Sequence, residues 1–257
     1  MKIAVCVKQV PDATVHKRID PATKRLDRSG EQALNPFDAH AIEEALRLKE
    51  GPAGSDSEVA VVCMGRDGAM RSLHKALSLG ADKAVLVTDP SLAGADINLT
   101  AKVLAAALQR EQYDLVLLGQ QAADSESYVM AAAVADHLKR PLVTQAAEVT
   151  LQDGSVRVKR QTEAGYDIIE APLPAVLSVS DAINEPRYPS LKAIMGAKRK
   201  PQETVSAADL GVSGEPRTEV LELSSPPAKA GGTKIEDEGG ASAEQIVAFL
   251  VERKVIS

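Results

Sequence analysis

Aromatic residues and cysteines are scarce in this chain of 257 residues. Aromatic residues make up 2% of the sequence and Trp is absent, so the core must be built from Ala, Val, Leu and Ile. Both cysteines, Cys6 and Cys63, lie within apolar runs and lack the paired spacing of a disulfide or zinc framework. We therefore expect two buried, reduced thiols in a cytoplasmic protein.

Other absences exclude further classes of protein. No apolar run approaches the ~20 residues of a membrane span, and the start lacks the apolar stretch and cleavage site of a signal peptide. The net charge of −6 gives no basic surface for a nucleic acid. The HExxH, GxSxG and GxxxxGK[ST] patterns are missing. No ligand spacing surrounds the four histidines, which are His16, His40, His74 and His137. The sequence thus gives no signal for acid–base, nucleophilic or zinc chemistry, and we name no catalytic residue and no metal ligand.

Apolar runs of strand length alternate with helical patterns in the first part of the chain. Each run is a near-continuous series of Val, Ile, Leu and Ala, which suits strands covered on both faces. The runs are residues 3–7, 59–64, 84–87 and 115–118, and the helical patterns cover 35–50, 66–80, 96–112 and 128–138. The alternation predicts an α/β fold with a doubly wound, mostly parallel, Rossmann-like sheet.

Capping residues mark the ends of two of these helices. Asn35 is a favourable N-cap and Pro36 suits the first helical position. Gly80 is expected to stop the helix of residues 66–80.

The pattern changes after Pro141. Residues 147–161 predict a β-hairpin with Asp153–Gly154 at its turn, residues 175–180 a further strand, and residues 184–200 a loop ending in basic residues. We expect a core of residues 1–185, a loop of 186–200 and an arm of 201–257.

The composition of the arm shifts to Pro, Gly, Ser and acidic residues, so residues 224–240 are expected to be extended or mobile. Ser242 and Gln245 form a capping-box pattern for a closing helix with Ile246, Phe249 and Leu250 on one side. Such an arm suggests docking on a partner. The alternative, a helix folded back on its own domain, stays open.

The turn after the strand of residues 115–118 is the main candidate site. Ligands of an open parallel sheet bind at the carboxyl ends of its strands, near the switch point, and helix N-termini suit phosphate. Gly119 permits close approach, and Ser125 and Ser127 can donate hydrogen bonds. Asp124 and Glu126 suit a phosphate badly, so we expect them to cap the helix, to face solvent or to bind a ribose or base. A purely structural strand-to-helix turn is an open alternative.

Several longer segments carry a resemblance to a known family. They are VKQVPD, NPFDAHAIEEALRLKE, KALSLGADKAVLV, DLVLLGQQAADSES, LPAVLSVSDAINEPRYPSLKAIMGAKRK and DLGV, and they run through most of the chain. The sequence resembles the beta (small) subunits of electron transfer flavoproteins. The resemblance implies a heterodimer with an alpha subunit that holds most of the FAD site. It also implies electrons taken from acyl-CoA dehydrogenases in fatty acid β-oxidation and passed to electron transfer flavoprotein-quinone oxidoreductase.

In that family the beta subunit holds a structural AMP, and in the electron-bifurcating branch a second FAD takes the place of AMP. The resemblance implies nucleotide contacts at Cys6, Asn35, Pro36, Phe37, Asp38, Met64, Gly119, Gln120, Gln121, Ala122, Ala123, Asp124, Ser125, Glu126, Ser127, Tyr128, Val129 and Met130. At 128–130 many relatives have a polar run, whereas Val129 and Met130 cannot donate side-chain hydrogen bonds. Backbone amides and the two serines would then bind the phosphate.

The resemblance also implies a partner-recognition segment. It comprises Tyr188, Leu191, Lys192, Ile194 and Met195, and Leu191 would insert into an apolar pocket on the dehydrogenase. Burial of one leucine contributes roughly 1.5–3 kcal/mol. The basic residues Lys192, Lys198, Arg199 and Lys200 would steer an acidic partner. The alternative is that Leu191 packs on its own domain and the basic residues form a solvated face.

Two other hypotheses remain open from the sequence. The first is a bifurcating subunit that carries its own FAD. The second is a stand-alone, nucleotide-binding α/β module of the universal-stress type. A further departure from the family is Gln161, which stands where relatives often have a Glu that regulates docking of the flavin domain, so we do not assign that role.

Overall fold

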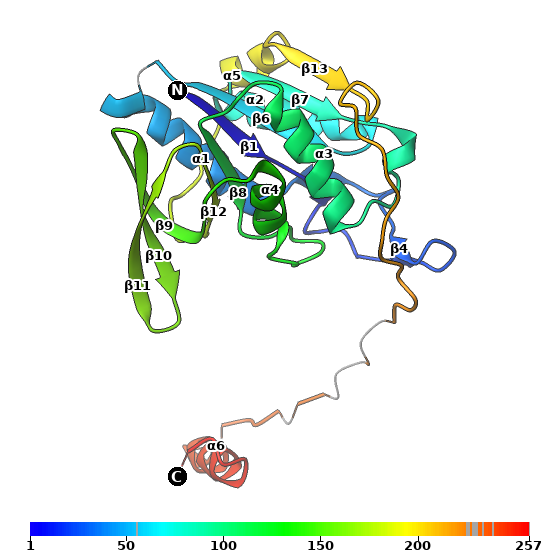
Figure 1. The fold of residues 1–257 in the computed structure, drawn as a ribbon. Coiled ribbons are helices and arrows are strands. Elements are labelled where there is room, and N and C mark those ends of the chain that lie inside the picture. The colour runs from blue at the N-terminus through cyan, green and yellow to red at the C-terminus, as the bar shows by residue number, and fades with distance from the viewer. Residues whose placement is uncertain (55, 225–226, 228–230, 233, 238, 257) are drawn as a thin grey trace. The chain divides into compact units, whose positions relative to one another are not determined.

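The computed structural model describes residues 1–54, 56–224, 227, 231–232, 234–237 and 239–256 (Figure 1). The chain divides into two units, Met1–Leu221 and Glu222–Ser257, and each is described by itself below.

A nine-stranded sheet organises the first unit (Figure 1). Its strand order is β11-β10-β9-β12-β8-β1-β6-β7-β13. Pairing is parallel from β9 to β13, and β10 and β11 are added antiparallel beyond β9. The strands of this sheet are β1 (Lys2–Cys6), β6 (Glu58–Met64), β7 (Lys83–Val87), β8 (Leu115–Gly119), β9 (Leu142–Gln152), β10 (Ser155–Thr162), β11 (Gly165–Pro172), β12 (Ala175–Val179) and β13 (Gln202–Val205). The predicted mostly parallel, doubly wound sheet is confirmed.

Helices cover both faces of the sheet (Figure 1). They are α1 (Pro36–Glu50), α2 (Met70–Leu79), α3 (Ile97–Gln109), α4 (Met130–Leu138) and α5 (Leu191–Ala197). In β1, Ile3 and Val5 pack with α1 and α2, while Ala4 and Cys6 pack with α3 and α4. Successive side chains of a strand point to opposite faces, so a strand covered on both faces must be apolar at every position. This explains the continuous aliphatic runs.

Short elements complete the first unit. Two small two-stranded sheets join β2 (Gln9–Pro11) to β5 (Gln32–Leu34) and β3 (Ile19–Asp20) to β4 (Arg25–Leu26), and 3₁₀ turns form at Pro52–Gly54, Asp67–Ala69 and Pro90–Leu92. Strand runs this short lie below the length at which a sequence pattern is informative, and the sequence did not predict them.

Most predicted element bounds agree with the structure. The four predicted strands lie within one residue of β1, β6, β7 and β8, and Gly80 ends α2 with a φ of 143°. The predicted hairpin turns at Asp153–Gly154, where Gly154 has a φ of 70°. The hairpin is larger than predicted, because β11 pairs with β10 and β9 continues into the parallel part of the sheet beside β12.

The loop predicted at residues 184–200 contains a helix, so that prediction is wrong for its second half. The Ser190 hydroxyl oxygen accepts a hydrogen bond from the Ala193 amide at 3.2 Å and caps α5. Ala197, at the end of α5, is buried, and α5 packs against α2. The sequence did not predict this helix, because it is only seven residues long and most of its apolar side chains face solvent.

The expected arm begins later than residue 201. Residues Gln202–Val205 form β13, which pairs in parallel with β7, and the first unit extends to Leu221. Val205 and Val212 are buried in the same core layer as α3. Two well-placed valines anchor a segment whose average composition is polar, and a composition argument cannot detect them.

The second unit contains α6 (Ala241–Glu252), and no residue of this helix is buried within the unit. The predicted capping box is wrong. Asp237 Oδ1 instead accepts hydrogen bonds from the Gly240 amide at 3.1 Å and from the Ser242 hydroxyl at 2.6 Å. Part of the stretch predicted to be extended, residues 224–240, lies outside the described residues.

Candidate functional site

The carboxyl edge of the central strands contains the topological switch point of the sheet. From β1 the chain proceeds through α1 to β6 and β7 on one side, then returns through α3 to β8 on the other side of β1. Cys6, Met64 and Gly119 end β1, β6 and β8 at this edge. Doubly wound α/β proteins bind their ligands at such a point. Three of the residues at which the resemblance implies nucleotide contacts, Cys6, Met64 and Gly119, are therefore brought together at one place.

Gly119 lies directly against the start of α1. A Cβ at this position would be 2.6 Å from the Phe37 carbonyl carbon and 2.7 Å from Asp38 Oδ1. Real Cβ atoms essentially never show such contacts, so the glycine allows β8 and α1 to approach. Close approach of a ligand to Gly119 stays a prediction, because the close neighbours of this glycine are Phe37 and Asp38 at the start of α1.

Asn35 is buried and connects α1 to the turn of residues 119–130. Its Nδ2 donates to Asp38 Oδ1 at 2.8 Å and to the Gln121 carbonyl at 2.9 Å, and its Oδ1 accepts from the Ala123 amide at 3.1 Å. Asn35 occupies the N-cap position of α1 and Pro36 is its first residue, as predicted, but the Asn35 side chain makes no capping hydrogen bond. Because both amide hydrogens are used, this side chain holds the turn in place.

Asp38 is a buried carboxyl group beside the same turn. It accepts hydrogen bonds from Asn35 Nδ2 at 2.8 Å and from the Lys8 amide at 2.7 Å. Burial raises the pKa of Asp38 to about 7, although these hydrogen bonds work in the opposite direction.

Asp124 has a side chain that is only 1% exposed, and it bridges two basic residues. Its Oδ1 lies 2.7 Å from Lys8 Nζ, and its Oδ2 accepts a hydrogen bond from Arg28. Burial works to raise the pKa of Asp124, but the hydrogen bonds and charges of Lys8 and Arg28 lower it. Asp124 therefore neither caps α4 nor faces solvent. The sequence did not predict the pairing, because Lys8 and Arg28 lie 116 and 96 residues away.

The turn itself has an unusual backbone before α4. The amides of Ser125 and Glu126 both donate to the Ala122 carbonyl. Glu126 and Tyr128 have positive φ values of 46° and 57°, and such backbone positions cost on the order of 1–3 kcal/mol each.

Helix α4 begins two residues later than predicted, with Val129 at its N-cap position and no side-chain capping bond. The first amides of α4 therefore have no side-chain acceptor among the described residues. They lie next to the exposed side chains of Tyr128 and Val129 at the carboxyl edge of the sheet. A helix start of this kind suits an anion.

Gln121 adds an unpaired acceptor. Its Oε1 is buried and has no hydrogen-bond partner among the described residues. A buried acceptor without a partner costs about 1–3 kcal/mol, and a donor group on a bound molecule would remove that cost. The arrangement is compatible with a nucleotide, because the amides at the start of α4 suit a phosphate and Gln121 Oε1 could accept from a hydroxyl or amino group once its side chain turned toward the ligand.

The remaining predicted contacts differ in exposure. Cys6 is buried, Phe37, Met64, Gln120, Ala122, Ala123, Ser127 and Met130 are half-buried, and Pro36, Ser125 and Glu126 are exposed. The Gln120 amide donates to the Val179 carbonyl at 3.0 Å and ties the turn to β12.

The two cysteines are free and buried, as predicted. Burial raises the pKa of Cys6 far above its usual range and that of Cys63 to about 12. Both thiols are therefore protonated at neutral pH and are poor nucleophiles. Within the described ranges, no group of His, Cys, Asp and Glu side chains is placed to bind a metal ion.

The predicted recognition segment projects from the first unit. Tyr188, Leu191 and Met195 are 93%, 74% and 71% exposed, and Ile194 and Lys192 are also exposed. The alternative in which Leu191 packs on its own domain is wrong within this unit. An exposed cluster of large apolar side chains is typical of an interaction surface.

Comparison with known proteins identifies the family of this chain. Residues 23–210 match the family model described as electron transfer flavoprotein domain. The chain is 38% identical to electron transfer flavoprotein subunit beta of Thermoanaerobacterium thermosaccharolyticum over the full length of both chains. It is 37% identical to the protein of that name from Mycobacterium tuberculosis, over 99% of each chain.

A third relative is the caffeyl-CoA reductase-Etf complex subunit CarD of Acetobacterium woodii, which is 38% identical and matches over 98% of this chain and 97% of its own length. The chain belongs to the electron transfer flavoprotein family, among its beta subunits. Family membership replaces the universal-stress hypothesis. No described helix is both long and apolar enough to cross a bilayer.

Proposed function

We propose that this chain is the beta subunit of a heterodimeric electron carrier. An alpha subunit would hold most of the FAD site, electrons would come from acyl-CoA and related dehydrogenases, and electron transfer flavoprotein-quinone oxidoreductase would accept them for the respiratory chain. The end-to-end match to beta subunits supports this role. The cytoplasmic location stays a prediction.

The proposed ligand of the switch-point site is AMP, and the unpaired Gln121 Oε1 is the observation that carries this proposal. This acceptor would receive a hydrogen bond from a hydroxyl or amino group of the nucleotide. The first amides of α4 would bind the phosphate, which makes the apolar side chains of Val129 and Met130 compatible with the site.

Two basic residues would add positive charge to the same site. Lys8 Nζ and Arg28 are partly exposed and are oriented by the buried Asp124. Asn35 and Asp38 would hold the turn without contacting the ligand, because their hydrogen bonds are already directed to one another and to the turn backbone.

The FAD of the heterodimer supplies reversible uptake of electrons. The role of this chain's own residues is to bind a nucleotide at the carboxyl edge, to dock the dehydrogenase through the exposed segment of residues 188–195, and to dock the alpha subunit through the second unit. The apolar side chains of α6 that are not buried within that unit support the last of these roles.

A second FAD in place of AMP is the competing proposal. It is favoured by the relative from Acetobacterium woodii, whose name places it in a caffeyl-CoA reductase-Etf complex. This chain is 38% identical to that relative and also 38% identical to the beta subunit of Thermoanaerobacterium thermosaccharolyticum.

The nucleotide content of the purified heterodimer tests both proposals. After co-expression with the alpha subunit and denaturation, chromatography and mass spectrometry should identify one FAD and one AMP per heterodimer. Two FAD and no AMP would replace the AMP proposal with the bifurcating one. One FAD alone would show that this edge holds no nucleotide.

A substitution links that content to the proposed site. Gln121→Ala removes the unpaired acceptor and should lower AMP content several-fold, since one lost hydrogen bond of about 1 kcal/mol weakens binding roughly fivefold. Gln109→Ala, at the exposed end of α3, is the matched control and should retain AMP. Equal AMP content in both variants would remove Gln121 from the site.

A further inference from the structure

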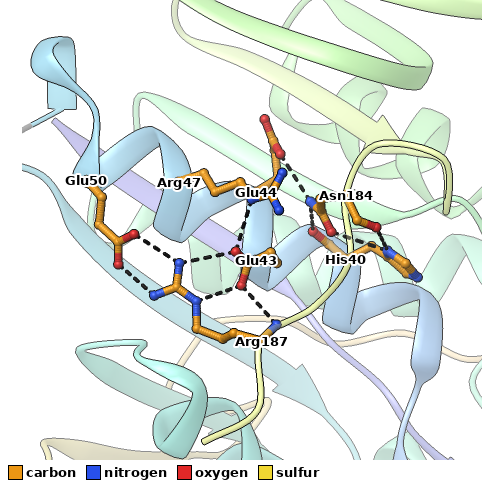
Figure 2. A network of polar contacts seen from close by, with 7 residues as sticks. All are labelled: His40, Glu43, Glu44, Arg47, Glu50, Asn184 and Arg187. Carbon is orange, nitrogen blue, oxygen red and sulfur yellow. Dashed lines mark hydrogen bonds and ion pairs between the residues drawn. The ribbon is translucent and has the colours of Figure 1, made fainter.

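The exposed segment of residues 188–195 begins directly after a residue with an extensive set of ionic contacts. Arg187 Nε lies 2.7 Å from Glu43 Oε2, and its Nη1 lies 2.6 Å from Glu50 Oε1 (Figure 2). Its Nη2 donates to both carboxylates, at 3.2 Å to Glu43 and 3.0 Å to Glu50, and its backbone amide donates to Glu43 Oε2 at 3.2 Å. One guanidinium group therefore connects two carboxylates that lie about two turns apart on α1.

Asn184 makes a second attachment to the same helix (Figure 2). Its Nδ2 donates to the His40 carbonyl at 3.0 Å and to Glu44 Oε2 at 3.1 Å. The His40 ring nitrogen Nδ1 lies 2.9 Å from the Asn184 carbonyl oxygen. Residues 184–187 are thus fixed along α1 over about three turns, from His40 to Glu50.

The charges of this network stabilise the attachment of Arg187 to α1. Burial alone would raise the pKa of Glu43, but hydrogen bonds from Arg187 and Arg47 lower it below its ordinary value. The Glu43 side chain is 6% exposed, so solvent screens this pair less than it screens a surface pair. A guanidinium has the planar fork that such an arrangement needs, and a lysine ammonium does not.

The far end of the exposed segment is also fixed. Ala197 is buried against α2, and Lys200 Nζ donates to the carbonyls of Leu77 and Ala81 at the end of α2. The apolar side chains of residues 188–195 are therefore presented between two anchored ends. The hydrogen bonds of Arg187 all go to Glu43 and Glu50 on α1, and none goes to these side chains.

We propose that Arg187, held by Glu43 and Glu50, is a positioning residue for partner docking, because it fixes the segment of residues 188–195 in the conformation that enters the partner. The partner surface would be an apolar depression with an acidic rim on a flavoprotein dehydrogenase, matching Leu191 and Met195 together with the basic Lys192. This inference rests on the proposed docking role of the segment. A preordered segment avoids the entropy cost of ordering side chains and loop on binding.

The test uses the complete heterodimer as electron acceptor of an acyl-CoA dehydrogenase supplied with its acyl-CoA substrate. Arg187→Ala should raise the KM for the heterodimer by about tenfold and change kcat by less than about twofold, because the docked complex is unchanged once it forms. Arg187→Lys, which keeps the charge without the fork, should give an intermediate KM. It also keeps the test available if the alanine variant fails to fold.

The matched control is Arg110→Ala, which removes another arginine–carboxylate pair of the same unit, 2.8 Å from Glu203. It should leave the KM unchanged. A lower Tm of Arg187→Ala and Arg187→Lys with an unchanged KM would show a purely structural role and overturn the proposal.

Leu191→Ala separates this inference from the proposed function on which it rests. A raised KM in Leu191→Ala but not in the Arg187 variants would overturn the positioning role alone. An unchanged KM in Leu191→Ala would overturn the proposed docking segment itself. A raised KM in both, with normal nucleotide content and heterodimer formation, is the result we expect.

Discussion

At the scale of single residues, buried polar groups determine the shape of the edge at the switch point. Asn35, Asp38 and Asp124 direct nearly all of their hydrogen-bonding capacity to one another, to the turn or to Lys8 and Arg28. A buried polar group without a partner is costly, so each of these residues constrains its neighbours. The residues that resemble ligand contacts in the sequence are therefore in part supports for the turn.

Asp38 should make the stability of the protein depend on pH. Its pKa of about 7 in the folded state lies above the unperturbed value of about 3.9, so the folded protein binds more protons than the unfolded protein between about pH 4 and about pH 7. The free energy of unfolding should therefore decrease as the pH rises through this window.

Asp38→Asn removes this titration. It should make the decrease of the free energy of unfolding with pH less steep by up to about 1.4 kcal/mol per pH unit. Urea unfolding of both proteins across the window measures it. Other buried carboxyl groups, such as Glu44, titrate equally in both proteins, so only the difference in slope matters. Parallel curves would show that Asp38 is already ionised throughout.

At the scale of elements, α5 and β13 have weak sequence patterns and are stabilised by packing in the folded unit. Each is short, and each is attached to a larger element, α5 to α2 and β13 to β7. Lys200 lies between them, and its Nζ donates to the carbonyls of Leu77 and Ala81 at 2.9 and 2.6 Å. The Leu77 carbonyl lies in the last turn of α2 and the Ala81 carbonyl directly follows the C-cap Gly80, and a cation is favourable at this end of a helix.

Lys200→Met should therefore destabilise the first unit by about 1 kcal/mol, a value reduced for partial solvent exposure. Thermal unfolding gives the measurement. Lys198→Met, two residues earlier and exposed, is the control and should leave the Tm unchanged. A Tm for Lys200→Met equal to that of the control would contradict the capping role.

At the scale of the whole molecule, the chain consists of a packed unit and a second unit whose described residues include none that is buried. Both hydrophobic layers of the sheet lie within Met1–Leu221. In Glu222–Ser257, α6 has no buried residue. The first unit should therefore fold alone, and α6 needs a surface outside its own unit to bury its apolar side chains.

Truncation after Leu221 tests this division. The isolated beta chain should keep its Tm within a few degrees, while its affinity for the alpha subunit should fall by at least about tenfold, as expected when an interface loses an apolar helix. Calorimetry and pull-down with tagged alpha subunit provide the two measurements. A large loss of Tm would show that the second unit belongs to the folded core, and undiminished alpha binding would show that α6 docks elsewhere.

The sequence by itself determined the central parallel strands and the helices α1 to α4. Aliphatic runs mark β1, β6, β7 and β8, and a repeat near four residues marks α1 to α4, because covering both faces of a parallel sheet imposes local patterns. It also located the carboxyl edge, since parallel strands place their ends together.

Only the tertiary structure decided which polar side chains meet. Asp124 pairs with Lys8 across 116 residues, and Arg187 pairs with Glu43 across 144. No local spacing encodes such pairs, because their geometry exists only after the strands and α1 have packed. The short helix α5 and strand β13 were decided in the same way, since their stability comes from the surfaces against which they pack.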